Sequence, residues 1–320
     1  MGDGQEPVRV IFDTDMGNDI DDAVALSVLH ALQTHGEAQL LAVTVTKDHD
    51  LAGPFVDVIN SFYGRGDIPI GVVRDGRTPS VRRYLELITE KNDIGEWVFA
   101  HDLASQRDAR EAVGLLRNVL AEQPDNSVVI IEVGFSTNLA RLITSVPDEH
   151  SQLIGKDLIA RKVRFLSIMA GMFPSNGERN AEFNIRHDIP AARRVAEDWP
   201  TRIIYSGFEV GRAVPYPIES IERDYRYVER HFLPEAFRLY AAGRRVGRRY
   251  PMWDVTSVIY GVRPDEGYFE LSPPGRVTID AEGNTRFVEE LGGPHRYLIV
   301  SAEQAARFQD TMVELAAEPP

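Results

Sequence analysis

The chain has 320 residues, of which 43% are hydrophobic, an ordinary apolar fraction for a globular protein. Its formal net charge of -14 argues against nucleic acid or an anionic membrane as a partner, because both would be repelled. The absence of cysteine excludes disulfide bonds, a thiolate nucleophile and zinc held by sulfur. Residues 1–6 lack the features of a secretory signal, and no apolar run approaches bilayer length, so the sequence predicts a soluble, cytoplasmic protein.

The first half of the chain alternates strand-like and helix-like patterns. An apolar run at residues 8–12 predicts a buried strand, and apolar residues at helical spacing predict a helix over residues 22–35, before Gly36. The same patterns predict a strand at 39–46, a helix at 55–63, a strand at 68–73, a helix at 109–122, a strand at 127–133 and a helix at 137–143. This alternation is typical of a mostly parallel sheet with helices on both faces.

The second half continues the pattern with interruptions. Further predicted elements are a strand at 163–170, a helix at 190–197, a strand at 201–205, strands at 276–280 and 296–300 around a turn at 282–284, and a helix at 302–316. Two stretches rich in charge and aromatic residues, 74–107 and 215–251, break the alternation, and we expect helical insertions or lids there. Because no linker rich in Ser or Gly divides the chain, the sequence predicts a single α/β domain over residues 1–320.

An acidic segment follows the first predicted strand. It contains five aspartates, namely Asp13, Asp15, Asp19, Asp21 and Asp22. So many like charges in one short loop would repel one another and lose hydration on folding, unless a divalent cation neutralised them or water kept them solvated. Taken singly, Asp21 or Asp22 can cap the following helix, and Asp19 can be a solvated turn residue. Together, with Gly17 permitting a tight turn, they predict a cation site.

The position of this loop also favours a ligand site. In parallel α/β sheets, ligands gather at the carboxyl ends of the strands, and the acidic loop lies at such an end. Carboxylate and carbonyl oxygens favour Ca²⁺ or Mg²⁺ over softer metals, and the absence of cysteine agrees with this preference.

Two known acidic motifs match the loop less well. An EF-hand needs flanking helices and a glycine at its sixth position, whereas a strand precedes this loop and Gly17 is misplaced. Phosphatases of the haloacid-dehalogenase type also follow their first strand with Asp-x-Asp, which Asp13 and Asp15 match. Those enzymes usually have Thr or Val where this chain has Gly17, and their metal-binding acidic pair lies much farther along the chain. The phosphatase is therefore the weaker alternative.

The whole pattern resembles that of the calcium-dependent nucleoside hydrolases. Their signature is Asp-Thr-Asp-x-Gly followed by an Asp-Asp-Ala that opens a helix, and this chain has both parts. Four further matches follow in order: residues 130–140 (IIEVGFSTNLA), Met169-Ala170-Gly171, Ala181-Glu182-Phe183-Asn184 and Trp253-Asp254. The resemblance spans residues 8–265 and implies a single-domain, Rossmann-like nucleoside hydrolase fold with helical insertions.

The resemblance implies a set of calcium ligands. Asp15 would bind Ca²⁺ and also accept the proton of the attacking water, and Asp22 would be a second, bidentate ligand. Asp254 would supply the third carboxylate, and the backbone carbonyl of Val133 would complete the set at a strand end.

The resemblance also implies ribose contacts from Asp21, Asn176, Glu182 and Asn184. Glu182 and Asn184 can instead cap the turn before Pro190. The loop departs from the commoner family pattern because Asn18-Asp19-Ile20 makes it two residues longer, so Asp19 can compete with Asp21 for the metal or the sugar. Another departure follows the second strand, where the family often has Gly-Asn and this chain has Lys47-Asp48-His49.

The base-binding side is less well defined. Trp253 stands where many members that accept pyrimidines have a His that protonates the leaving base. An indole cannot deliver that proton but can stack on a base, which resembles the purine-preferring branch. Alternatively, Trp253 fills core beside a helix start. We expect Phe183 to pack inward, and His101 either reaches the base or the 5′-hydroxyl, or is a surface histidine.

These observations predict an enzyme that hydrolyses the N-glycosidic bond of ribonucleosides, with purine nucleosides favoured. Calcium would activate the water, Asp15 would act as general base, and the products would be free base and ribose. A catalytically silent, calcium-dependent nucleoside- or sugar-binding protein is the alternative of another class. The family resemblance also implies a homo-oligomer, either a dimer or a tetramer.

Overall fold

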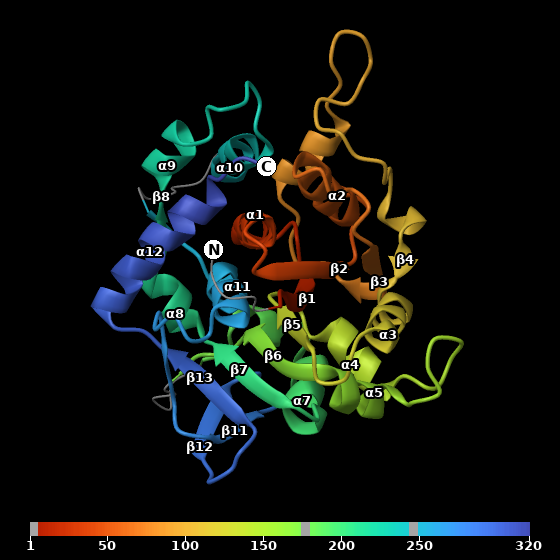
Figure 1. Ribbon diagram of the computed structural model, residues 1–320, viewed down its shortest axis with the longest axis vertical. Coiled ribbons are helices and arrows are strands. Elements are labelled where there is room, and N and C mark those ends of the chain that lie inside the picture. Colours follow the sequence, from red (N-terminus) through yellow and green to blue (C-terminus); the bar gives the residue numbers. More distant parts are fainter. Residues whose placement is uncertain (1–5, 174–179, 243–248) are drawn as a thin grey trace.

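A large central sheet organises the protein, as the computed structural model shows for residues 6–173, 180–242 and 249–320. Within these ranges the sheet has eleven strands in the order β12-β11-β13-β7-β6-β5-β1-β2-β3-β4, with β10 pairing β13 (Figure 1). The strands are β1 Val8–Thr14, β2 Ala38–Lys47, β3 Ile70–Arg77, β4 Arg110–Glu111, β5 Val128–Glu132, β6 Val163–Met169, β7 Arg202–Ser206, β10 Glu270–Leu271, β11 Gly275–Ile279, β12 Thr285–Glu289 and β13 His295–Ile299. Neighbouring strands from β13 through β7 to β4 run parallel, so the predicted mostly parallel α/β fold is confirmed.

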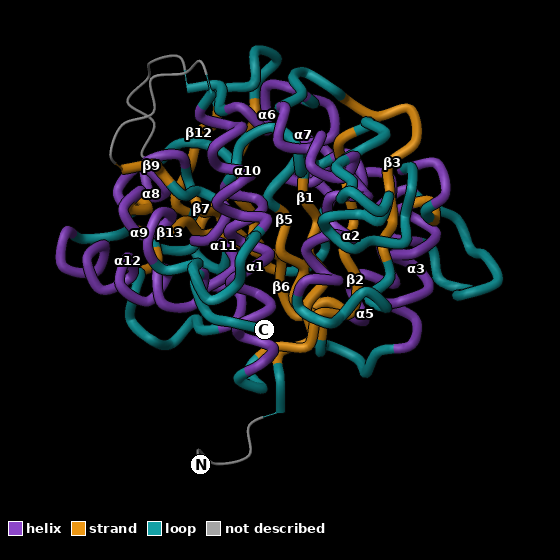
Figure 2. The backbone as a smooth tube through the Cα atoms, turned by 90° about the horizontal axis from the view of Figure 1, so that it is seen from above, coloured by secondary structure: helices purple, strands orange, loops and turns teal. Residues whose placement is uncertain are grey.

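Helices cover both faces of this sheet, which Figure 2 shows at the centre of the molecule. They are α1 Asp21–Thr34, α2 Ala52–Phe62, α3 Ala112–Glu122, α4 Thr137–Thr144, α5 Gly155–Lys162, α6 Phe183–His187, α7 Ile189–Asp198, α8 Phe208–Ala213, α9 Ile218–Arg223, α10 Phe232–Ala241, α11 Asp254–Val262 and α12 Ala302–Ala316. In Figure 1, α1, α2, α10 and α12 lie on one side of the strands and α3, α4, α5 and α7 on the other. No helix in the described part of the chain is long and apolar enough to cross a membrane.

Alternation of side chains along the strands divides the apolar residues into two cores. In β1, Val10 and Phe12 belong to one buried cluster, and Ile11 between them belongs to the other. In β5, Val129 and Ile130 are divided in the same way. Successive strand residues point to opposite faces, so a continuous apolar run is what a strand covered on both faces requires. Each fully buried large side chain contributes about 1.5–3 kcal/mol.

Most predicted elements are present with small shifts at their ends. The second helix begins at Ala52, three residues before its predicted start, because Pro54 is tolerated in the first turn of a helix. The prediction missed α5 at Gly155–Lys162, since Leu158 and Ile159 are its only buried large side chains and the apolar period is weak.

The two interrupting stretches differ from each other. Residues 215–251 contain α9 and α10 between the short paired strands β8 Pro215–Pro217 and β9 Arg249–Pro251, so a helical insertion is confirmed there. In the stretch 74–107, the end of β3 is followed by turns, extended segments and the 3₁₀ helices η1 Arg83–Thr89 and η2 Gln106–Asp108. This stretch, all of which the structure describes, contains no α-helix, so the expectation of an α-helical insertion was wrong there, and the alternative of a lid stays a prediction. Many of its residues are exposed, which leaves little apolar burial to stabilise longer helices.

The C-terminal strands extend the sheet. The predicted turn at 282–284 joins β11 to β12, a strand that the sequence did not indicate, and β13 then returns beside β7. β12 lies at the sheet edge, where Arg286, Glu289 and the half-exposed Val288 give a weak strand pattern. β11 and β12 are antiparallel, and together they form the lower edge of the sheet in Figure 1.

The chain order reverses at β1. It pairs with β2 on one side and β5 on the other, and both neighbours are parallel to it. The carboxyl ends of β1 and β5 therefore lie side by side at the point where successive connections leave in opposite directions. This is where ligands bind in open α/β sheets.

Candidate active site

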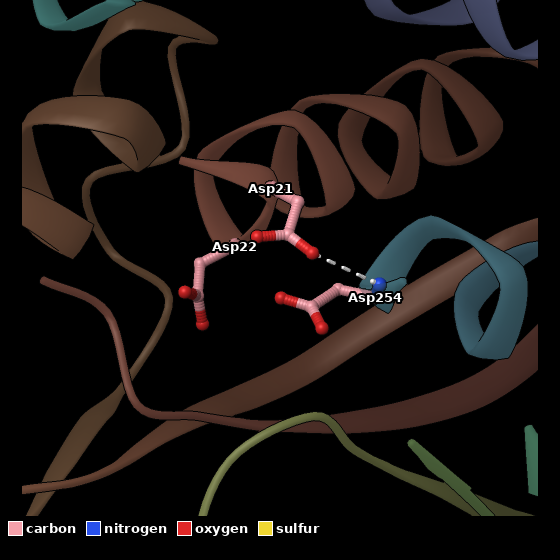
Figure 3. Close-up of side chains that lie close together, drawn as sticks. All are labelled: Asp21, Asp22 and Asp254. Atoms are coloured by element: carbon pink, nitrogen blue, oxygen red, sulfur yellow. Dashed lines mark hydrogen bonds between the residues drawn. The ribbon is translucent and has the colours of Figure 1, made fainter. Parts of the chain in front are cut away.

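Three aspartates from two helix starts converge at this switch point. Asp21 and Asp22 occupy the first turn of α1, and Asp254 is the first residue of α11. Each offers a carboxylate oxygen, and these oxygens all lie within 4.8 Å of one another (Figure 3). Asp21 Oδ2 accepts hydrogen bonds from the backbone N–H groups of Trp253 at 3.1 Å and Asp254 at 3.4 Å. We call these three residues the acidic triad.

Burial makes the negative charges of this region costly. Burial, with the neighbouring charge of Asp19, raises the pKa of Asp21 to about 8. Burial and the nearby aspartates raise the pKa values of Asp22 and Asp254 well above their usual range. A divalent cation would remove this penalty, because it is attracted to the ionised form of each group. The donors are all hard oxygens, so the residues present fit Ca²⁺ or Mg²⁺.

Asp15 lies beside the triad in the loop that follows β1. It is 4% exposed, and its Oδ2 accepts a hydrogen bond from the side-chain amide of Asn18. Burial raises the pKa of Asp15 to about 7, whereas the charge of Lys47 and the hydrogen bond from Asn18 oppose this rise. Nearby, the hydroxyl of Thr14 donates to Asp22 Oδ1 and fixes that carboxylate.

A cavity of about 210 Å³ joins these groups to others predicted from the sequence. Its described lining consists of Asp15, Asn18, Asp19, Asp21, Asp22, Val133, Met169, Glu182, Phe183, Asn184, Phe208, Trp253 and Asp254. We call it the acidic cavity. Every predicted metal ligand and the predicted ribose contacts Asp21, Glu182 and Asn184 line it, so residues far apart in sequence meet at one place.

Glu182 and Asn184 form a polar wall of the acidic cavity. Glu182 caps α6, where its Oε1 accepts from the N–H of Asn184 at 2.9 Å, and its Oε2 also accepts from Gly171 N–H at 3.4 Å. The capping role considered from the sequence is therefore present together with the position in the cavity. Asn184 donates through Nδ2 to the carbonyl oxygens of Val133 and Met169, both at 3.1 Å.

Aromatic rings form the third wall. The Trp253 indole stacks on Phe208 with ring centroids 5.4 Å apart and an interplanar angle of 19°, and its Nε1 donates to the Phe208 carbonyl at 2.9 Å. A Cβ at Gly211 would overlap Trp253, so only glycine permits this packing. Phe183 was predicted to pack inward, but it is the first residue of α6, is 36% exposed and lines the cavity.

Two predicted contacts remain, His101 and Asn176. His101 is half-buried, with its Nδ1 2.8 Å from the Phe99 carbonyl and its ring centroid 5.0 Å from that of Trp97. The described lining of the acidic cavity therefore does not include His101. Asn176 lies outside the described residues.

Asp13, the nucleophile required by the phosphatase alternative, is fully buried. Its Oδ1 accepts hydrogen bonds from the Thr44 hydroxyl and, at 2.9 Å, from the Asn138 amide. Asp13 is absent from the described lining of the acidic cavity, so its carboxylate is not presented to a substrate there.

Sequence reasoning did not assign roles to two charged residues buried near the site. Lys47, the last residue of β2, has no exposed surface, and its ammonium donates to the side-chain oxygen of Asn18. Glu132, the last residue of β5, is also fully buried, and neither of its carboxylate oxygens has a hydrogen-bond partner among the described residues. In the sequence, Lys47 and Glu132 are marked only by their position, since each is a charged residue at the end of an apolar strand.

The protein is thus an α/β fold in which clustered carboxylates and aromatic rings line one cavity at the switch point of a parallel sheet. The model of the family "Inosine-uridine preferring nucleoside hydrolase" matches residues 10–310. The chain belongs to this family.

Individual relatives agree with that assignment. The inosine-uridine preferring nucleoside hydrolase of Crithidia fasciculata is 25% identical over 205 residues, which are 62% of this chain and 60% of that protein. The match thus spans about three fifths of the length of that relative. Among solved structures, an inosine-uridine preferring nucleoside hydrolase from Bacillus anthracis gives a TM-score of 0.70 at 20% identity, covering 97% of this chain and 99% of that one. A plant nucleoside hydrolase also gives 0.70 at 20% identity, covering 96% and 99%.

Proposed function

We propose that this protein hydrolyses the N-glycosidic bond of ribonucleosides, purine nucleosides above all, to free base and ribose. The observation that carries the proposal is the convergence on one cavity of the acidic triad, Asp15, a polar wall and an aromatic wall. The carboxylates and the polar wall suit the hydroxyl groups of a ribose. The aromatic wall suits a flat base. Membership of the nucleoside hydrolase family agrees with this division of the cavity.

Calcium is the cation we propose for the site. Asp15, Asp22 and Asp254 would bind it through carboxylate oxygens and Val133 through its carbonyl, and Asp21 stands close enough to join them or to bind ribose hydroxyls. When bound, the ion supplies the positive charge that makes a water molecule easier to deprotonate. Ca²⁺ accepts six to eight oxygen ligands in a flexible geometry, whereas Mg²⁺ requires a nearly ideal octahedron, so a site built from carboxylates and a carbonyl of the fold favours Ca²⁺.

Asp15 would act as the general base. Its carboxylate lines the cavity and is held by Asn18, so it can take the proton of a water molecule that attacks the anomeric carbon of the ribose. As the bond to the base breaks, positive charge develops on the sugar ring, and the surrounding carboxylates stabilise it. Glu182 and Asn184 would hold the ribose hydroxyls in place for that attack.

The aromatic wall supports the preference for purines. Trp253 and Phe208 are stacked, and Phe183 adds a third ring to the same cavity. A two-ring base offers more surface for stacking than a pyrimidine. Since an indole cannot donate a proton to the departing base, we propose that Trp253 assists by stacking on a purine that is protonated on its imidazole ring.

Chromatographic detection of free base tests this function. The protein would be incubated with purine, pyrimidine and nicotinamide ribosides, once with calcium and once with chelator. We expect calcium-dependent release from purine ribosides. Release from pyrimidine ribosides alone would retain the hydrolase and reject the stacking role of Trp253. Binding of nucleosides to the calcium-loaded protein without any release of base would instead identify a catalytically silent binding protein. Cytoplasmic location and a homo-oligomeric state stay predictions.

A further inference from the structure

A buried lysine lies behind the acidic loop. Lys47 has no exposed surface, and its ammonium donates to two neutral oxygens, the side-chain oxygen of Asn18 and the backbone carbonyl of Ser80. Burying an ammonium is expensive unless nearby groups stabilise its charge. Burial lowers the pKa of Lys47, and the negative charges of Asp15 and Asp22 oppose that effect, so Lys47 lies within the electrostatic field of the metal centre.

Asn18 links this lysine to Asp15. Its Oδ1 accepts from the Lys47 ammonium and also from the Ser80 hydroxyl at 3.0 Å. Both partners donate to the same atom, so the amide oxygen must face them and the NH₂ group must face the other way. That NH₂ group donates to Asp15 Oδ2. The chain of contacts thus has a direction, from the lysine charge through the amide to the carboxylate.

The loop that carries Asn18 is fixed from several sides. The Gly17 N–H donates to the Tyr84 hydroxyl at 2.7 Å, and that hydroxyl donates to the Asp19 carbonyl at 2.8 Å. The Asp19 carboxylate accepts from the Tyr240 hydroxyl at 2.7 Å. The two additional residues of the loop are therefore held in place, and Asn18 reaches Asp15 from a rigid backbone.

We propose that Lys47 and Asn18 are positioning residues for Asp15: Asn18 occupies one carboxylate oxygen of Asp15, and Lys47 orients Asn18 while offsetting negative charge at the metal centre. The inference rests on the proposed function for its catalytic part. Its metal-binding part stands independently of which substrate is used.

The balance of charges at the site predicts the direction in which Lys47 and Asn18 change calcium affinity. Asp15 and the acidic triad supply four carboxylates, and one divalent ion neutralises only two of them. Lys47 neutralises part of the remainder and therefore weakens calcium binding, while Asn18 keeps one oxygen of Asp15 away from the ion. Together they lower the affinity for calcium and hold Asp15 in the orientation in which it can accept a proton.

Calorimetric titration of calcium into two variants tests this inference. Removal of the lysine charge in Lys47→Met should tighten calcium binding by about tenfold or more, because a buried positive charge near a divalent ion repels it. Asn18→Ala should tighten it by about threefold, because Asp15 Oδ2 becomes free to bind the ion. In both variants kcat should fall by about tenfold or more with little change in KM, since substrate contacts are intact.

Lys162→Met is the matched control. Lys162 is also largely buried, with 13% of its side chain exposed, and donates to the Gln123 carbonyl at 2.7 Å, but it lies just before β6, at the amino-terminal end of that strand. Calcium affinity and kcat should stay unchanged in this variant. If Lys47 and Asn18 were only structural, their loss would weaken calcium binding, and that result would overturn the proposal.

The double variant Asn18→Ala/Lys47→Met separates positioning from independent effects. Since Lys47 acts on Asp15 orientation through Asn18, the double variant should lose little more kcat than Asn18→Ala alone. Fully additive losses would contradict the linkage.

If the wild type releases no base from any riboside, the proposed function fails, whereas tighter calcium binding in the variants would still support the charge balance. If Lys47→Met does not fold, the change in calcium affinity of Asn18→Ala alone supports or overturns the proposal: tighter binding supports it, and weaker binding overturns it.

Discussion

At the residue scale, Asp15 has the most demanding role in the proposed reaction. It lies in the acidic cavity beside the triad, and its Oδ2 is held by Asn18. Replacement by asparagine keeps the shape of the side chain but removes the ability to accept a proton at neutral pH. Asp15→Asn should therefore lower kcat by about 10²- to 10⁴-fold, the usual contribution of a general base.

The measurement is steady-state release of base, with thermal unfolding as a check that the variant folds. Asp67→Asn, an exposed aspartate between α2 and β3, serves as the control and should behave as the wild type. An Asp15→Asn enzyme with full activity would refute the assignment of Asp15 as general base.

Trp253 decides the second residue-scale prediction. Stacking of a base on an aromatic side chain contributes about 1–3 kcal/mol, so Trp253→Ala should lower kcat/KM for purine ribosides by about tenfold or more. The loss for pyrimidine ribosides should be smaller, because they offer less surface to the ring. Trp97→Ala is the control, since Trp97 is 41% exposed and does not line the described cavity. Equal losses for both classes of base would argue that Trp253 only fills space beside α11.

At the element scale, the contact between α8 and α11 sets the position of the aromatic wall. Gly211 of α8 lies against Trp253, and an added Cβ would overlap both its ring and its backbone. Gly211→Ala should therefore displace Trp253, raise KM for purine ribosides and destabilise the fold by about 1–3 kcal/mol, the usual effect of overpacking.

Gly114→Ala provides the comparison for this prediction. Gly114 lies in α3, where an added Cβ would meet only the Glu111 carboxylate, at 3.8 Å. Alanine is the better helix former, so this variant should be as stable as the wild type or more stable by up to about 1 kcal/mol. Thermal unfolding and KM measured on both variants give the answer. An unchanged KM in Gly211→Ala would show that Trp253 does not depend on α8.

Sequence patterns predicted the elements that position the site, because the residues of these elements are neighbours in the sequence. The acidic loop, the strand before it and the helix after it are contiguous in sequence, so charge and periodicity together reveal them. Val133 and Asp254 had to be assigned by family resemblance, since nothing local distinguishes a carbonyl or an isolated Asp as a ligand. α5 and β12 were missed because their apolar patterns are weak and their stability comes from neighbouring elements.

The contacts among buried polar groups could not be predicted in the same way. Lys47 and Asn18 are 29 residues apart, and their meeting depends on how the loop after β1 folds across the end of β2. Lysine at the end of a strand is usually solvated, so its sequence position alone indicates no partner. Likewise, the exposure of Phe183 follows from the orientation of α6, a five-residue helix that the sequence did not indicate.

At the scale of the whole molecule, the acidic cavity should make stability depend on both pH and calcium. In the metal-free protein, burial raises the pKa of Asp15 to about 7 and that of Asp21 to about 8, and it raises those of Asp22 and Asp254 well above their usual range. In the unfolded chain these carboxyls titrate near 3.8. These four groups therefore bind more protons in the folded protein than in the unfolded chain up to about pH 8, and their contribution to the free energy of unfolding falls as pH rises through this range.

Between pH 6.5 and 8.5 this effect can be observed separately from the buried histidines. Burial lowers the pKa values of His30 and His231 to about 3, so their effect on stability is confined to pH values below about 6.5. With chelator present, we expect the melting temperature to fall steadily from pH 6.5 to 8.5. With excess calcium it should be higher throughout and fall less, because the ion neutralises the carboxylates that would otherwise need protons. A melting temperature that fell equally with and without calcium would show that these carboxylates do not bind the ion, and it would move the metal site elsewhere in the molecule.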